Sequence, residues 1–145
     1  MRSLKDYSIY LLSKRDYGVK ELERKLILKG YELGEIEQII QYYLSIGYLN
    51  DEKLIVRVIS YQISKDKNKK QIEMYLIGKG FDYQLIKSHL NEMNFKEIEE
   101  AIIEKQIIKY SKLTRPISDE KKINRLLNKG YSYESIKKVM DSQTE

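Results

Sequence analysis

Leu26-Ile27-Leu28-Lys29-Gly30-Tyr31 returns fifty residues later as Leu76-Ile77-Gly78-Lys79-Gly80-Phe81, and fifty residues after that as Leu126-Leu127-Asn128-Lys129-Gly130-Tyr131. An isoleucine follows each copy at the same offset, at Ile36, Ile86 and Ile136. A fixed period of this length indicates a repeat architecture. Such architectures build extended binding surfaces more often than catalytic pockets, so the repeat favours a protein that works through partners.

Each copy is typical of a helix that stops at a Lys-Gly step and is followed by a second helix. Glycine adopts the left-handed conformation that ends a helix, and a lysine suits the negative end of the helix dipole. The three glycines are therefore predicted to be C-terminal caps, with the next aromatic residue folded back onto the helix. Asp82 and Ser132 are predicted to be N-caps of the following helices, and Glu32 is a weaker candidate.

A third helix precedes each pair, and helical spacing of apolar residues places it at about Arg2–Lys14 in the first copy. In the second copy Asn50 is predicted to cap a helix through about Ser64, and in the third the helix runs from about Phe95 to Leu113, before Thr114-Arg115-Pro116 breaks the chain. The expected fold is all-α, with three tandem three-helix, helix-turn-helix-like repeats at 1–50, 51–94 and 95–145. We expect these repeats to form a curved, elongated array.

Composition narrows the class of protein. The chain has 145 residues, of which 41% are hydrophobic, a net charge of +5 and no cysteine. The lack of cysteine excludes disulfides and thiolate chemistry. The charged N-terminus does not resemble a signal peptide, and no apolar run reaches the roughly 18 residues needed to span a bilayer. We therefore expect a cytoplasmic protein that does not enter the membrane.

Catalytic and metal-binding signals are missing from the sequence. His89 is the only histidine, and its repeat equivalents Ile39 and Val139 are apolar, so we interpret it as a packing residue. A metal site or a general base would need partners that no motif supplies. Gly78-Lys79-Gly80 resembles a phosphate-binding loop only in composition, because the repeat explains it as a helix end. We predict no enzymatic activity, cofactor or metal.

Two basic segments have no counterpart in the first repeat and are the predicted partner-binding residues. The first, in the loop between two helices, holds Lys65, Lys67, Lys69 and Lys70; the second holds Lys105, Lys109, Lys112 and Arg115. The lysines of the second segment share one helix face, which we expect to be free for a partner. The ordinary preference of a helix C-terminus for cations explains them equally well.

Tyrosine is abundant, with thirteen residues and no tryptophan. Aromatic side chains among basic residues are a common platform for single-stranded nucleic acid, and Tyr17, Tyr61, Tyr75 and Tyr110 are the candidates. The alternative is that these are residues at the edge of the core, with a buried ring and a solvated hydroxyl. The sequence favours the second interpretation.

The ordered motifs resemble the RecX family of bacterial recombination regulators over roughly residues 5–140. The motifs are Glu21-Leu22-Glu23-Arg24-Lys25-Leu26, Lys29-Gly30-Tyr31, Gly47-Tyr48-Leu49-Asn50-Asp51-Glu52 and Gly130-Tyr131-Ser132-Tyr133-Glu134-Ser135-Ile136. The chain departs from the family where Gly18 replaces a serine cap and where Leu54-Ile55 replaces an aromatic residue followed by alanine. Most of the family's arginines are lysines here.

The resemblance implies a protein that binds the RecA–DNA filament in its helical groove and lowers its ATPase, strand-exchange and SOS coprotease activities in DNA repair and recombination. It implies no catalytic residues. A short array of linked units suits such a role, because linked contacts raise effective concentration. We expect a monomer that contacts RecA, and the filament groove would also bring it close to DNA. The alternatives are a direct DNA-binding protein built from helix-turn-helix-like units and a generic helical scaffold.

Overall fold

The computed structural model describes residues 2–143, and this part of the chain contains α-helices and no strand. The helices are α1 Leu4–Lys14, α2 Val19–Lys29, α3 Leu33–Ser45, α4 Asp51–Ser64, α5 Lys69–Gly78, α6 Tyr83–Asn91, α7 Phe95–Ser111, α8 Asp119–Asn128 and α9 Tyr133–Gln143. The all-α prediction is confirmed. The leading helices of the first and third repeats, α1 and α7, are each shorter than expected at one end. α1 starts at Leu4 because Ser3 caps it, and α7 stops at Ser111.

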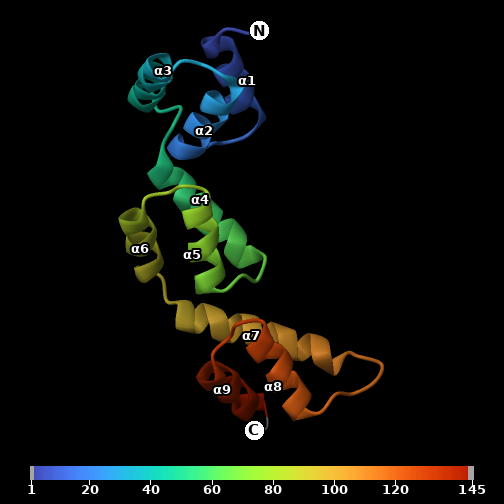
Figure 1. Ribbon diagram of the computed structural model, residues 1–145. Helices are drawn as coiled ribbons and strands as arrows, with labels where there is room; N and C mark the ends of the chain where they lie inside the picture. Colours follow the sequence, from blue (N-terminus) through green and yellow to red (C-terminus); the bar gives the residue numbers. More distant parts are fainter. Residues whose placement is uncertain (1, 144–145) are drawn as a thin grey trace.

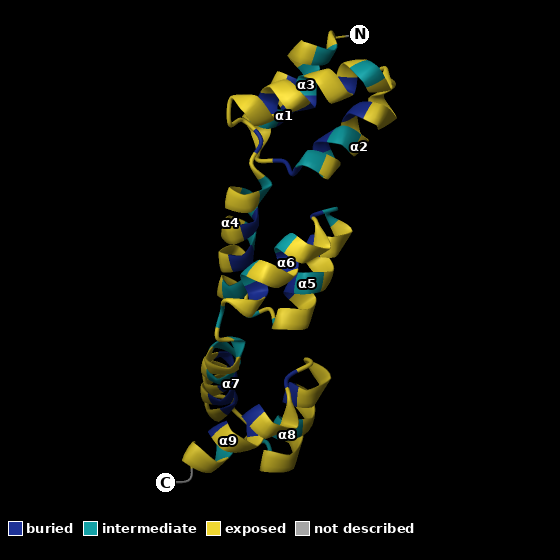
Figure 2. Cartoon of the chain, turned by 90° about the vertical axis from the view of Figure 1, so that its left-hand side faces the viewer, coloured by how far each residue is buried: buried dark blue, intermediate teal, exposed yellow. Residues whose placement is uncertain are grey.

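The buried residues form separate cores along an elongated molecule. Figure 1 shows the helices in three successive groups, α1–α3, α4–α6 and α7–α9, with the N and C ends at opposite ends of the array. One hydrophobic cluster surrounds Leu22 and Leu26, another surrounds Ile72 and Leu76, and a third surrounds Ile103 and the fully buried Leu126. The dark interior of each group in Figure 2 shows the same division. No helix among residues 2–143 is both long and apolar enough to cross a membrane.

The three Lys-Gly steps end their helices in the same way, as predicted. Gly30, Gly80 and Gly130 have φ values of 101°, 87° and 95°, in the left-handed region. In the second group Gly80 donates its N–H to the Ile77 carbonyl at 3.0 Å and Phe81 donates to the Leu76 carbonyl at 3.2 Å. The first and third copies repeat both bonds, which together are the Schellman motif.

The following aromatic residues fold back as expected. Phe81 and Tyr131 are buried and Tyr31 is half-buried, each packed against its own group's core.

The predicted N-caps are also confirmed. The Asn50 side chain accepts from the Lys53 N–H at 3.1 Å, and the Asp82 carboxylate accepts from the Leu85 N–H at 3.0 Å. Ser132 accepts from the Ser135 N–H at 3.2 Å. Glu32 caps α3 with both carboxylate oxygens, one on each of two backbone N–H groups. These bonds satisfy donors that would otherwise be lost at the helix start.

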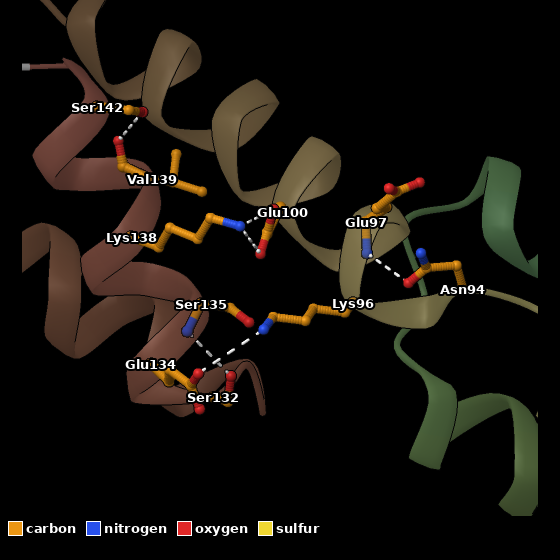
Figure 3. A network of polar contacts seen from close by, with 10 residues as sticks. All are labelled: Asn94, Lys96, Glu97, Glu100, Ser132, Glu134, Ser135, Lys138, Val139 and Ser142. Carbon is orange, nitrogen blue, oxygen red and sulfur yellow. Dashed lines mark hydrogen bonds and ion pairs between the residues drawn. The ribbon is translucent and has the colours of Figure 1, made fainter.

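α7 is a single continuous helix, although its apolar residues form two offset stripes. Ile102, Ile103, Ile107 and Tyr110 are all buried, whereas Ala101 is exposed. α9 packs along α7, and Figure 3 shows two cross-helix pairs there, Lys138 to Glu100 at 3.2 Å and Lys96 to Glu134 at 3.8 Å. Through this packing α7 contributes its buried residues to the core of the third group.

Candidate partner-binding surface

The Lys-Gly turn of the second group docks onto the start of α2 in the first group, and we call these contacts the first joint. Lys79 Nζ lies 3.0 Å from Glu21 Oε2, and Arg15 Nη1 lies 2.9 Å from Glu21 Oε1. Burial is the largest single influence on the pKa of Glu21 and raises it, but the hydrogen bonds from Arg15 and Lys79 together prevail and lower that pKa. Glu21 therefore holds the turn as a carboxylate.

Two close approaches complete the first joint. A Cβ on Gly80 would lie 2.9 Å from the Lys20 Cβ, so glycine is needed for contact with the α2 backbone as well as for the turn. α2 lacks a cap of its own because Gly18 has no side chain, and Asp51 from α4 accepts the Val19 N–H at 2.9 Å instead. Burial of the Asp51 carboxylate raises its pKa, and the Val19 hydrogen bond partly offsets that effect.

The contacts between the second and third groups, the second joint, use the equivalent turn. Asn68 Nδ2 donates to the Lys129 carbonyl at 3.2 Å, and Tyr131 OH donates to the Asp66 carbonyl at 3.2 Å. The Asp66 carboxylate pairs with Lys105 Nζ at 3.2 Å. Burial is the main cause of the raised pKa of Tyr131, with Asp66 and Glu99 adding to it. The hydroxyl is therefore held in its protonated, donating form.

The two joints are related by the same fifty-residue period as the sequence. Gly18 and Asn68 are repeat equivalents, and each meets the incoming turn of the next group. Asp16 and Asp66 are also equivalents, and Asp16 pairs with Arg57 of α4 at 2.9 Å, as Asp66 pairs with a cation of α7. A Cβ on Gly30, by contrast, would meet nothing within 4 Å. Each joint therefore holds a Lys-Gly turn against the preceding group.

The predicted basic residues are divided by the structure. Lys65 and Lys67 lie in the exposed α4–α5 loop, while Lys69 and Lys70 stand in the first turn of α5 and not in the loop as predicted. Lys105, predicted to belong to a face free for a partner, instead forms the ion pair of the second joint, because α7 runs past the α4–α5 loop.

Lys109, Lys112 and Arg115 are exposed at the end of α7 and just beyond it. Lys112 is the C-terminal cap residue of α7, a position that suits a cation. Within the second basic segment, Lys105 forms an ion pair with Asp66, whereas these three exposed side chains are positioned to meet a partner.

Among the candidate tyrosines, Tyr17 and Tyr110 are buried and cannot stack with a ligand, whereas Tyr61 and Tyr75 are exposed. His89 is partly buried on α6, with Nε2 3.9 Å from Glu52 Oε1, which agrees with its interpretation as a packing residue. Within residues 2–143 no three histidine, aspartate or glutamate side chains are grouped so that they could hold a metal ion.

The structure adds a set of surface residues that sequence reasoning missed. Ile27, Ile77 and Leu127 occupy one repeat position and are 42%, 41% and 39% exposed. Leu33, Tyr83 and Tyr133 occupy another, and are 59%, 46% and 55% exposed. The repeat alignment shows these apolar positions, but it does not distinguish them from the neighbouring apolar positions of the core. The structure distinguishes them, because these side chains are exposed and the core side chains are buried. Each group thus shows solvent the same pair of apolar side chains.

The part of the chain containing the first group matches a family model. Residues 5–42 match the model described as RecX, first three-helix domain. These residues cover α1 except its first residue, all of α2 and most of α3.

Similar proteins extend the match over nearly the whole chain. The chain is 31% identical over 143 residues to a "Regulatory protein RecX" of Haemophilus ducreyi, covering 94% of this chain and 89% of that protein. It is 29% identical to a "Regulatory protein RecX" of Vibrio parahaemolyticus, over 99% of this chain and 93% of the relative. The crystal structure of RecX from Lactobacillus salivarius aligns with a TM-score of 0.79 at 22% identity, covering 94% and 92% of the two chains. This last likeness concerns the fold.

Proposed function

Because this chain belongs to the RecX family of regulatory proteins, we propose that it binds the filament that RecA forms on DNA and restrains it. In this proposal the protein lowers filament growth, ATPase activity and coprotease activity by contact alone, without chemistry of its own. It acts as a monomer in the cytoplasm, where the filament assembles. The proposal rests on the family and on the shape of the exposed surface.

The observation that carries the proposal is the repeated apolar pair. Ile27, Ile77 and Leu127 lie near the ends of α2, α5 and α8, and Figure 2 shows these three helices along the same side of the array. A filament presents the same protomer surface again and again. A chain that shows one apolar pair per group can meet successive protomers with successive groups, and linked contacts bind more tightly than separate ones.

We propose that residues 1–50, 51–94 and 95–145 are the units of this recognition. The three separate hydrophobic clusters support this division, because each is built from three consecutive helices. The basic residues then contribute at the rim of the contact. Lys65, Lys67, Lys69, Lys70, Lys109, Lys112 and Arg115 are exposed and available to a partner, while Lys105 contributes through the second joint.

The test is a variant that removes one repeated pair, Ile77→Ser with Tyr83→Ser, assayed on the DNA-dependent ATPase of RecA. The matched control is Val56→Ser with Tyr61→Ser, which removes two comparably exposed apolar side chains from the same group at positions that are not repeated. Both variants should keep the circular dichroism spectrum of the native chain, because all four side chains are exposed.

We expect the repeated-pair variant to weaken inhibition at least tenfold and the control to leave it within about twofold. Such a difference corresponds to about 1.4 kcal/mol of lost contact. Electron microscopy of RecA filaments with each variant gives an independent measurement of filament length. If the native chain leaves both ATPase and filament length unchanged, the proposal is wrong; if the two variants behave alike, the repeated pair is not the contact.

A further inference from the structure

The two joints repeat one arrangement, so each end of the array carries one half of a joint that has no counterpart within residues 2–143. At the N-terminal end this is the turn at Leu28-Lys29-Gly30, after α2, which we call the turn face. At the C-terminal end it is the start of α8, with Pro116, Ser118, Lys121 and Asn124, which we call the receiving face. All of these residues are exposed, so both half-joints are open to solvent.

The turn face has the backbone shape of the two turns that dock, but it is uncovered in the described part of the chain. A Cβ on Gly80 or Gly130 would lie 2.9 or 2.7 Å from an atom of the preceding group, whereas a Cβ on Gly30 would meet nothing within 4 Å. Leu28 stands at the repeat position of Gly78 and is 86% exposed. An exposed apolar tip on a surface built for docking favours contact with another chain.

The turn face is positively charged. The cavity beside it, of about 310 Å³, is lined by two cations and two aromatic rings, Arg2, Lys29, Tyr7 and Tyr10. None of these residues is acidic, and Lys29 Nζ lies 5.2 Å from the centre of the Tyr7 ring. The Arg2 carbonyl accepts the Tyr31 hydroxyl at 2.7 Å, which leaves the turn itself open.

The receiving faces of the first two groups meet incoming cations with carboxylates, and the third does not. Asp16 and Asp66 pair with cations of the next group at 2.9 and 3.2 Å. Glu21 pairs with the lysine of the incoming turn at 3.0 Å. In the third group Pro116 stands at the repeat position of the two aspartates, and Lys121 stands at that of Glu21. Both acidic positions are therefore lost at the C-terminal end.

The remaining acids of the receiving face do not replace those carboxylates. Asp119 pairs with a lysine of its own helix at 3.5 Å. Glu120 stands at the repeat position of Lys20, whose ammonium lies 4.0 Å from a carboxylate of its own helix and whose stem meets the incoming turn. The receiving face therefore presents a cation where the first group presents Glu21.

We propose that the two end faces are a joint between copies of this chain that Lys121 interrupts. If the receiving face of one copy took the turn face of another, Lys121 would stand where Glu21 stands in the first joint, and it would face Lys29. Two like charges in place of an ion pair oppose docking. The protein therefore stays as separate molecules, although its ends are two halves of one repeated joint.

The interruption prevents open-ended growth. Docking of one end on the other is head-to-tail, and such contacts build filaments when they do not close into rings. Repeat proteins need end units that do not offer a further docking surface for the same reason. The proposal concerns contacts between copies and does not depend on RecA.

The test measures crosslinking between two copies of the full chain, without RecA. One copy carries Leu28→Cys and the other, of different mass, carries Asn124→Cys. These positions are equivalent to Gly78 and Arg24, which meet across the first joint at 3.5 Å, and the chain has no cysteine of its own. The same short bismaleimide crosslinker on a single chain with Arg24→Cys and Gly78→Cys gives the rate for a formed joint.

Charge reversal at the two ends gives four pairings. The first copy carries either Lys29 or Lys29→Glu, and the second carries either Lys121 or Lys121→Glu. We expect the pairings of opposite charge to crosslink about 5- to 30-fold faster than those of like charge, because an exposed attraction and an exposed repulsion each change an equilibrium by up to about fivefold. The difference should shrink in about 1 M salt, which screens exposed charges.

The matched control is Lys137→Glu in the second copy, which reverses the charge of an exposed lysine on α9 and should leave the native crosslinking rate unchanged. Three results would overturn the proposal. If the pairings of opposite charge are no faster than this control, the end faces do not form a joint. If the pairing of two glutamates is as fast as those of opposite charge, net charge sets the rate. If the native pairing already reacts at the rate of the formed joint, Lys121 interrupts nothing.

Discussion

Replacing Gly80 by alanine tests whether the Lys-Gly turns are joints as well as helix caps. Gly30 is the matched control, since both glycines have positive φ and end a helix with the same two backbone hydrogen bonds. They differ in one respect. A Cβ at position 80 would lie 2.9 Å from the Lys20 Cβ of the neighbouring group, whereas a Cβ at position 30 would meet nothing within 4 Å.

The structure sets the expected magnitudes. Alanine in a left-handed conformation costs about 1–2 kcal/mol, and both variants carry that cost. The Lys20 Cβ is fixed to the α2 backbone and cannot swing aside, so in Gly80→Ala the second group must move away from the first. That movement weakens the Lys79–Glu21 pair, worth up to about 1 kcal/mol. It also weakens the Asp51 cap on Val19, worth about 1 kcal/mol. Gly80→Ala should therefore cost about 1–2 kcal/mol more than Gly30→Ala.

Two measurements separate the joint from the cap. Urea unfolding followed by circular dichroism gives the loss of unfolding free energy. A distance distribution between spin labels at Lys5→Cys and Lys87→Cys gives the movement of the two groups, and the chain has no cysteine to compete for the label. Gly80→Ala should broaden or shift this distribution and Gly30→Ala should not. Equal losses of stability with an unchanged distance in both variants would refute the joint.

Three further predictions concern single groups at the joints. Glu21→Gln should lower the free energy of unfolding at neutral pH. Because the pKa of Glu21 is depressed in the folded protein, the carboxylate stabilises the fold above about pH 4.5, and this contribution is lost as the pH falls through the folded pKa. The unfolding free energies of the native chain and the variant, measured from pH 7 to 3, should therefore converge. Asp51→Ala should cost about 1 kcal/mol and speed exchange of the Val19 amide, whereas Asp51→Asn should cost less at pH 7, since the raised pKa of Asp51 means that its charged form is disfavoured in the fold. Tyr131→Phe should remove the bond to the Asp66 carbonyl and cost about 1 kcal/mol, with faster exchange in α8 as the check and an unchanged rate as the contrary result.

The helices and their ends could be predicted from sequence because the forces that set them act over a few residues. The Schellman turn at Gly80 needs only Leu76, Ile77 and Phe81, all within five residues along the chain. The caps by Asn50 and Asp82 reach three residues ahead. The same local character made His89 recognisable as a packing residue, since its repeat equivalents are apolar.

The candidate site was predicted less well, because it depends on which side chains meet across the joints. Lys105 looked like part of a free basic face, and only the path of α7 past Asp66 shows that it is paired. The absent cap at Gly18 looked like a departure from the family pattern. The structure explains it, because Asp51 caps α2 from the next group and the Phe81 ring lies 3.3 Å from where a Cβ on Gly18 would stand.

The sequence by itself determined a repeated helical chain, its capped turns and its family, because a fifty-residue period and short-range hydrogen bonds are recorded in neighbouring residues. The tertiary structure decided which side chains of each repeat are exposed and which pair with a neighbouring group. Glu21 and Gln71 occupy one repeat position, yet the Glu21 carboxylate pairs with Arg15 and, across the first joint, with Lys79, whereas the Gln71 amide accepts the Asn68 N–H in the cap of its own helix. That contrast follows from the positions of groups up to about sixty residues apart in the chain, so it becomes apparent only when the helix groups are stacked.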